Sequence, residues 1–215
     1  MRFYLSTLAL LWAIFFVPCL VSATSIVPYL NLADATLNSE CVVLARAVEN
    51  QVSTENNRTY LETKFESMEL TKGVLTPGTS FSVRPFSRNI GKFHVDIAGD
   101  FKPEIGKTYL LFLNQRDNYW RPVMLSYYVF EQLQDGDDAF LVPLGSNEIE
   151  LVKSPDGLYA EPQGVYKKEL LLQQLKAIAG SPQLIWDGNK GRTSLHAEDF
   201  AALDRAVPTG CDFKL

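Results

Sequence analysis

The stretch TYLLFLNQ, residues 108–115, decides the fold because Tyr109 to Leu113 are apolar without alternation. A short run that is apolar on both faces predicts a central, fully buried strand. The stretch CVVLARAVEN, residues 41–50, is apolar at first and then polar, which predicts a strand buried at one end. With 215 residues, 47% of them hydrophobic and 21% charged, the chain can build one good core. These values exclude a disordered chain, a collagen-like chain and a polytopic membrane protein.

The segments between these two stretches carry the pattern of further strands. In YLETKFESMEL, residues 60–70, the apolar positions change parity, which predicts a long bent strand with a β-bulge near residues 66–67. A bent strand of this kind helps to close a small barrel. TSFSVRPF, residues 79–86, alternates cleanly and predicts a shorter strand. We expect a polar turn over residues 51–59 and a loop over residues 87–107.

The second half of the chain predicts two hairpins and then two helices. The turn at residues 135–138 joins two apolar stretches, and residues 148–161 predict another hairpin. Helical periodicity occurs at residues 165–180 and again at residues 195–207, after the capping residue Ser194. The apolar stripe of the first helix consists of Leu171, Leu175 and Ile178.

Strands first and helices last predict a mainly β fold with an antiparallel barrel and helices added to it. We expect the barrel at residues 40–145, after a lead-in segment at 24–39, with the second hairpin and both helices of residues 146–215 packed on it. Four side chains are expected to fill one closed cylinder and to leave no cleft equipped to break bonds: Val43, Phe65, Val83 and Leu111.

The first 23 residues are typical of an export signal. An apolar run of 14 residues, from Leu8 to Val21, follows the single charge of Arg2. Small residues then predict cleavage after Ala23, which leaves 192 residues and changes the net charge from −5 to −6. An uncleaved N-terminal anchor is the alternative. We therefore expect a secreted or periplasmic protein that does not bind the membrane after cleavage. Its negative charge disfavours nucleic acid as a partner.

Export affects how the cysteines are interpreted. Cleavage removes Cys19 and leaves Cys41 and Cys211, an even pair in an oxidising compartment, which predicts a disulfide between them. Two buried free thiols are the alternative. Asn57, followed by Arg58 and Thr59, forms a glycosylation sequon that has meaning only in a eukaryotic host.

The order of these segments resembles a class of exported bacterial proteins with a closed barrel of the oligonucleotide/oligosaccharide-binding (OB) type. The resemblance covers residues 40–133 and rests on SECVVLARAV, on TKGVLTPG, on TSFSVRPF and on the entry into the central strand, FKPEIGKTYLLFL. In that last stretch the matching positions are Phe101, Gly106 and residues 109–113. The resemblance implies an OB-like barrel, the barrel class that also includes the inhibitory domain of tissue inhibitors of metalloproteinases. A fold of this kind hosts many unrelated functions.

Two departures limit what the resemblance implies. The class often has a helix between its third and fourth strands, whereas residues 87–107 show no helical period. The metalloproteinase inhibitors chelate the zinc of their target through an N-terminal cysteine. The mature chain is expected to start at Thr24, with Cys41 well inside it, so that mechanism transfers to no residue of this sequence.

Residues for catalysis are scarce in the sequence. There are two histidines, and none of the common metalloprotease, redox, hydrolase or P-loop motifs occurs. His94 with Cys41 could form a base and a thiol nucleophile, but a loop histidine and a structural cysteine are the simpler interpretation. We expect His196 to be a solvated residue at a helix start, Asp135, Asp137 and Asp138 to form a hairpin tip, and Glu62, Lys64 and Glu66 to lie on a solvated sheet face. The sequence predicts no metal site and no cofactor.

Aromatic residues gather in one predicted hairpin. Tyr119, Trp120 and Tyr128 are candidate ligand-binding residues, because an exposed aromatic strip on a barrel can stack on sugars or peptides. The alternative is that these rings pack the barrel and its helical cover. The function expected is an exported, non-catalytic binding or interaction module with a protein or saccharide partner. The alternatives are an inhibitor or accessory domain of a secreted hydrolase, and a hydrolytic enzyme with an unrecognised site.

Overall fold

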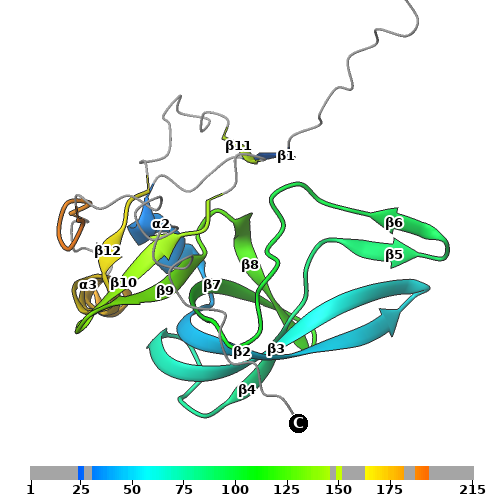
Figure 1. Cartoon of the computed structure of the whole chain (residues 1–215), viewed down its shortest axis with the longest axis horizontal. Coiled ribbons are helices and arrows are strands. Elements are labelled where there is room, and N and C mark those ends of the chain that lie inside the picture. The colour runs from blue at the N-terminus through cyan, green and yellow to red at the C-terminus, as the bar shows by residue number, and fades with distance from the viewer. Residues whose placement is uncertain (1–23, 27–30, 146–148, 152–162, 182–186, 194–215) are drawn as a thin grey trace, which may run out of the picture.

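Five strands close into a barrel at the centre of the structure (Figure 1). Around the barrel the order is β2 (Cys41–Glu55), β3 (Arg58–Lys72), β4 (Ser80–Val83), β8 (Tyr119–Ser126) and β7 (Thr108–Arg116), and β7 pairs with β2 to complete the circle. All these pairs are antiparallel except β4 with β8, which run parallel and meet at Val83 and Trp120. The mainly β fold with a small closed barrel confirms the sequence prediction.

The structure is a computed structural model, and it describes residues 24–26, 31–145, 149–151, 163–181 and 187–193. Beside the barrel, β9 (Phe130–Asp135), β10 (Asp138–Pro143) and β12 (Tyr166–Lys167) continue the sheet from β7. A hairpin of β5 (Arg88–Ile90) and β6 (Phe93–Val95) pairs with β3, while β1 (Thr24–Ile26) and β11 (Ile149–Leu151) form a separate parallel pair. The helices are α2 (Leu32–Asn38) and α3 (Lys168–Gly180).

Alternate side chains of β2 and β7 build two cores, one on each side of the barrel wall. Inside the barrel Val43, Phe65, Val83 and Leu111 meet in one cluster, as the sequence predicts. On the outside, the intervening residues pack against α2 and α3; Val42, Leu44, Leu110 and Phe112 belong to this second cluster. Both faces of β7 are therefore buried, which explains why its sequence is apolar without alternation.

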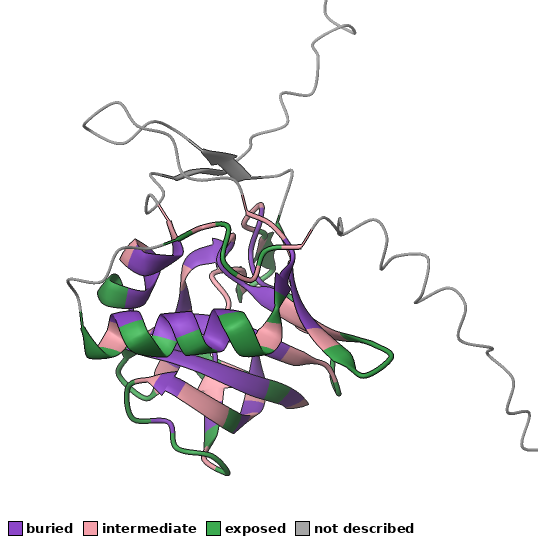
Figure 2. Cartoon of the chain, turned by 90° about the vertical axis from the view of Figure 1, so that its left-hand side faces the viewer, coloured by how far each residue is buried: buried purple, intermediate pink, exposed green. Residues whose placement is uncertain are grey.

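Helix α3 covers the outer face of the sheet with its buried side turned inward (Figure 2). The predicted stripe of Leu171, Leu175 and Ile178 is buried, and the helix ends at Gly180 as expected. The other helix, α2, was not predicted and lies in the segment expected to be a lead-in. Asn31 caps α2 by accepting a hydrogen bond from the Asp34 amide at 3.0 Å, and Lys72 Nζ donates to the carbonyls of Thr36 and Leu37 near its end.

The polar stretch at residues 51–59 is not the long turn that its composition predicts. Strand β2 continues to Glu55, and only Asn56 and Asn57 form the turn, with φ of 49° and 61°. A two-residue hairpin turn of type I′ needs positive φ at both positions, and asparagine tolerates this better than most other non-glycine residues. The predicted bulge is confirmed within a residue or two, because the register between β2 and β3 shifts so that Met68 has no cross-strand partner.

Residues 87–107 form no helix, in agreement with the sequence, but they contain the β5–β6 hairpin within the expected loop. The hairpin predicted around the turn at residues 135–138 is confirmed as β9 and β10, joined at Gly136 and Asp137. Most of the second predicted hairpin and the helix predicted at 195–207 lie outside the described residues. The described strand β11 pairs in parallel with β1.

Candidate binding site

The β2–β3 hairpin extends beyond the barrel as a two-stranded arm (Figure 1). Strand β3 pairs with β4 only as far as Thr63, and it pairs with β5 at Arg58 and Thr59. Side chains alternate along a strand, so Thr63, Leu61 and Thr59 lie on the same face as the core residue Phe65. The face that fills the barrel therefore continues onto the arm, where Leu61 is 57% exposed.

A pocket of about 260 Å³ lies between this face of the arm and the chain that runs from β4 to β7. Its apolar part comes from the barrel interior, from Leu61 and from three prolines, and its polar part comes from β2, β3, the β5–β6 hairpin and the residues on either side of that hairpin. The lining residues are Asn50, Thr59, Leu61, Thr63, Val83, Pro85, Ser87, Arg88, Asn89, His94, Asp96, Asp100, Phe101, Lys102, Pro103 and Pro122. The pocket is the mouth of the barrel, roofed by the segment that the sequence indicated only as a loop.

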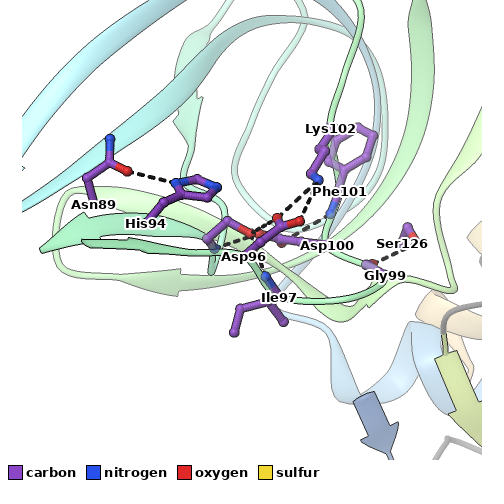
Figure 3. A network of polar contacts seen from close by, with 10 residues as sticks. Asn89, His94, Asp96, Ile97, Gly99, Asp100, Phe101, Lys102 and Ser126 are labelled. Carbon is purple, nitrogen blue, oxygen red and sulfur yellow. Dashed lines mark hydrogen bonds and ion pairs between the residues drawn. The ribbon is translucent and has the colours of Figure 1, made fainter. Parts of the chain in front are cut away.

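Hydrogen bonds to two aspartates hold the roof of the pocket in place (Figure 3). Asp100 accepts from the Ser87 amide at 2.7 Å and from its neighbour Phe101 at 3.1 Å. Asp96 accepts from Ser87 Oγ at 3.2 Å and pairs with Lys102 at 3.1 Å. The hydrogen bond and charge of Lys102 hold the pKa of Asp96 below its ordinary value. Both carboxylates are thus already occupied by donors of the roof itself.

The roof is also tied to the barrel wall. Ser126, the last residue of β8, donates to the carbonyl of Gly99 through its amide at 3.0 Å and through its hydroxyl at 2.8 Å (Figure 3). The preceding residue, Leu125, has φ of 54°, a left-handed conformation that is costly for a branched side chain. This conformation occurs at the end of β8, where Ser126 reaches the roof.

His94, Asp96 and Asp100 all line the pocket. The sequence had predicted a barrel without a cleft that brings such residues together. Their contacts do not form a nucleophile and its base. His94 Nδ1 lies 2.7 Å from Asn89 Oδ1, while Ser87 Oγ donates to Asp96 and accepts from the Ile97 amide at 3.0 Å. A serine is activated by a base that takes its proton, and a carboxylate with a lowered pKa is a poor base. The contacts among the described residues therefore favour a binding site over a catalytic site in this pocket.

The three aromatic residues chosen from the sequence do not meet at this pocket. Trp120 is 7% exposed inside the barrel, and Tyr128 is 2% exposed in the core under the helices. Tyr119 is half-buried, and its ring stacks on Arg84 with the guanidinium carbon 3.7 Å from the ring centre. Buried rings have no open face on which a sugar could stack, so the structure gives no support to this strip as a ligand platform.

The expectation that Glu62 lies on a solvated sheet face is wrong, because Glu62 is buried. It accepts a hydrogen bond from Arg84 Nε at 2.6 Å and another from Ser53, while Arg84 also pairs with Glu55. Burial lowers the pKa of Arg84, but its bonds to the two glutamates raise it above the ordinary value. The ring of Tyr60 covers the guanidinium from another side. This cluster fastens the arm to β4 on the face opposite the pocket.

Cys41 lies fully buried in the barrel core and forms no disulfide with any described residue, and its predicted partner Cys211 lies outside the described residues. Burial raises the pKa of Cys41, although main-chain bonds near Leu75 and the charge of Lys72 oppose the shift. No described contact joins Cys41 to His94, which bonds to Asn89. The pairing of these two residues as nucleophile and base therefore receives no support.

Once the predicted bridge to Cys211 is reduced, Cys41 is expected to resist alkylation for as long as the protein stays folded. At pH 8 its raised pKa leaves less thiolate than an ordinary cysteine has, and the barrel keeps the reagent out. We expect iodoacetamide to modify it at least about 100-fold more slowly than in the reduced, unfolded chain, because reaction requires opening of the core. Peptide mass spectrometry measures the rate. Rapid modification of the native thiol would contradict the buried position.

Some features are absent from the part of the chain that the structure describes. No group of three or more metal-ligating side chains comes together there. None of the described helices has the length and hydrophobicity needed to cross a bilayer.

Sequence reasoning missed most residues of the pocket. It singled out Val83, Phe101 and His94, but the first two as barrel residues and the last as a loop residue. One signal was available: Thr59, Leu61 and Thr63 share the parity of Phe65, so a strand longer than the barrel carries the core face outward. Comparisons with known protein families, with curated proteins and with solved structures gave no match.

Proposed function

We propose that the chain is an exported binding module that holds its ligand in the pocket at the mouth of the barrel. The observation that carries the proposal is the pocket itself, a preformed cavity lined by both apolar and polar side chains. Its volume of about 260 Å³ lies just below the usual ~300–1,000 Å³ of small-molecule sites, which suits a short segment of a ligand.

The position of the pocket supports the proposal. In OB folds, ligands bind across the second and third strands of the barrel, between the loops at the ends of neighbouring strands. The second and third barrel strands here are β3 and β4, and they contribute Leu61, Thr63 and Val83 to the pocket. The same proposal includes three further points. The chain belongs to the exported bacterial class with this barrel, it is exported, and Cys41 and Cys211 form a disulfide.

Filling the pocket tests the function. Leu61 is exposed and faces the cavity, so Leu61→Trp is expected to block the pocket without disturbing the core. The probes are a glycan array and a phage-displayed library of linear heptapeptides, screened with the full chain. We expect at least tenfold weaker binding of the selected probe by Leu61→Trp. The matched control is Val74→Trp, which changes another exposed residue that does not line the pocket and should bind like the wild type.

Two outcomes would contradict the binding module. If Leu61→Trp binds the selected probe as well as the wild type does, the pocket is not the site. A second function, a hydrolase, is favoured by one observation, the gathering of His94 with two aspartates. Labelling of Ser87 by a fluorophosphonate, with loss of labelling in His94→Asn, would establish the hydrolase in place of the binding module.

A further inference from the structure

Strand β3 has a gap in its hydrogen bonding at the pocket. The Ser67 amide donates to the carbonyl of Thr79, and the Ser67 carbonyl accepts from the amide of Gly78, so the main chain of Ser67 points toward the β4 side. Main-chain groups alternate in direction along a strand, and β3 has no bulge between Arg58 and Ser67. Phe65, Thr63, Leu61 and Thr59 therefore point the same way as Ser67.

Among these residues, Leu61 has no partner on that side in the described structure. Phe65 and Thr63 pair with Phe81 and Val83 of β4, and Thr59 pairs with Asn89 of β5. Leu61 pairs only with Val52 on the other side, at a position where antiparallel strands exchange no main-chain hydrogen bonds. Its N–H and C=O thus open into the gap between β4 and β5.

The chain that crosses the gap uses its own polar groups elsewhere. The amide of Arg84 donates to the carbonyl of Trp120 at 2.9 Å, and Pro85 has no N–H. The amide of Ser87 donates to Asp100, and the carbonyl of Phe86 accepts from the guanidinium of Arg88 at 2.9 Å. The Leu61 side chain lines the pocket, so its open donor and acceptor lie at the pocket as well. The gap is one residue pair long, because β3 pairs with β4 at Thr63 and with β5 at Thr59 but with neither strand at Leu61.

The pocket lining carries two cations, Arg88 and Lys102, and two carboxylates, Asp96 and Asp100, and two further cations, Arg58 and Lys92, lie on the elements beside the gap. Arg88 lines the pocket, and Lys92 lies in the turn between β5 and β6. No carboxylate of the described residues forms an ion pair with Arg88, Lys92 or Arg58, whereas Asp96 pairs with Lys102 and Asp100 accepts hydrogen bonds from the amides of Ser87 and Phe101. These free cations favour an acidic ligand.

We propose that the ligand is an extended, acidic peptide segment of a partner protein, which adds the missing residue pair to β3. One peptide residue exchanges both main-chain hydrogen bonds with Leu61, and the peptide leaves the sheet on either side of that residue, because β4 and β5 already pair with Thr63 and Thr59. Its neighbour places an apolar side chain over Val83 and Phe101, and an acidic side chain lies beside Arg88. This inference rests on the proposed function and narrows its ligand from a protein or saccharide to a peptide.

The test removes the Leu61 donor alone. Leu61→Pro deletes an N–H that points into the gap and leaves the β2–β3 bonds intact, while Leu61→Ala removes the side chain and keeps the N–H. The probe is the tightest heptapeptide selected from the displayed library, titrated calorimetrically into each full-length variant. We expect Leu61→Pro to bind about tenfold more weakly than Leu61→Ala. Arg88→Gln should weaken the binding of that peptide severalfold and reduce its dependence on salt.

A second measurement keeps the inference falsifiable if Leu61→Pro fails to fold in a thermal melt. The peptide is resynthesised with a single N-methyl group at each position in turn, and one position should lose at least tenfold in affinity for the wild type. Equal binding by Leu61→Pro and Leu61→Ala, or no effect of any N-methyl group, overturns the peptide inference. A saccharide bound in the pocket without any peptide overturns the inference and leaves the proposed function standing. If neither a peptide nor a saccharide binds the wild type, the peptide inference and the proposed function are both wrong.

Discussion

Phe65→Ala is expected to lower the free energy of unfolding by about 3–5 kcal/mol. Phe65 is fully buried at the centre of the barrel. Its ring stacks on Phe81 at 5.7 Å and on Phe101 at 6.2 Å, and it meets the edge of Tyr109 at 6.3 Å between ring centres. The alanine variant loses the transfer free energy of the ring and leaves a cavity that three rigid aromatic neighbours cannot close.

Chemical denaturation followed by circular dichroism measures this loss. Val74→Ala is the control, because Val74 is 73% exposed and surface substitutions usually change stability by no more than about 0.5 kcal/mol. A loss below about 1 kcal/mol for Phe65→Ala would mean that the ring is not enclosed, and the closed barrel would have to be abandoned.

Arg84→Met is expected to lower the free energy of unfolding by about 3–5 kcal/mol, because it leaves the Glu62 carboxylate buried without its cation. Arg84 joins Glu62 and Glu55 and lies between the rings of Tyr60 and Tyr119. The methionine keeps much of the apolar volume, so the loss reports mainly the missing charge. Since the cluster fastens the arm to β4, the variant should also loosen the wall of the pocket.

A double variant separates the missing charge from lost packing. Arg84→Met combined with Glu62→Leu removes both charges and should recover most of the stability, since an ion pair replaced by apolar residues is often neutral. Arg46→Met breaks the exposed pair with Glu66 and serves as the matched control, with an expected loss of about 1 kcal/mol or less. If the double variant is as unstable as Arg84→Met alone, the buried charge is not the cause.

Local patterns were reliable where one face of an element had to be buried. The stretch at residues 108–115 is apolar on both faces because β7 lies between two cores, and the stripe of α3 is apolar because it covers the sheet. The bulge was found within a residue or two, since a register shift changes which side chains point inward. Composition failed at residues 51–55, where polar residues form a strand because residues 58–62 of β3 pair with them.

The candidate site was much harder to predict, because its residues come from strands and loops far apart in the chain. Asn50, Leu61, Asn89 and Pro122 show no common motif, and they line one pocket only because the barrel closes. Aromatic residues suggested a platform at Trp120 and Tyr128, but sequence alternation does not say which rings a helix will cover. Glu62 was expected in solvent because no local signal indicates that Arg84, 22 residues later, will reach it.

The sequence by itself determined the class of fold, the central strand, the main hairpin and the long helix, because each depends on periodicity within a dozen residues. Only the tertiary structure decided that β3 extends beyond the end of its neighbour β4. It also decided that the main-chain groups of residues 84–88 bond to partners other than β3, and that Leu61 faces the gap this leaves. These features depend on which strands meet and where their pairing stops, and the free energy of that choice is set by contacts between distant segments.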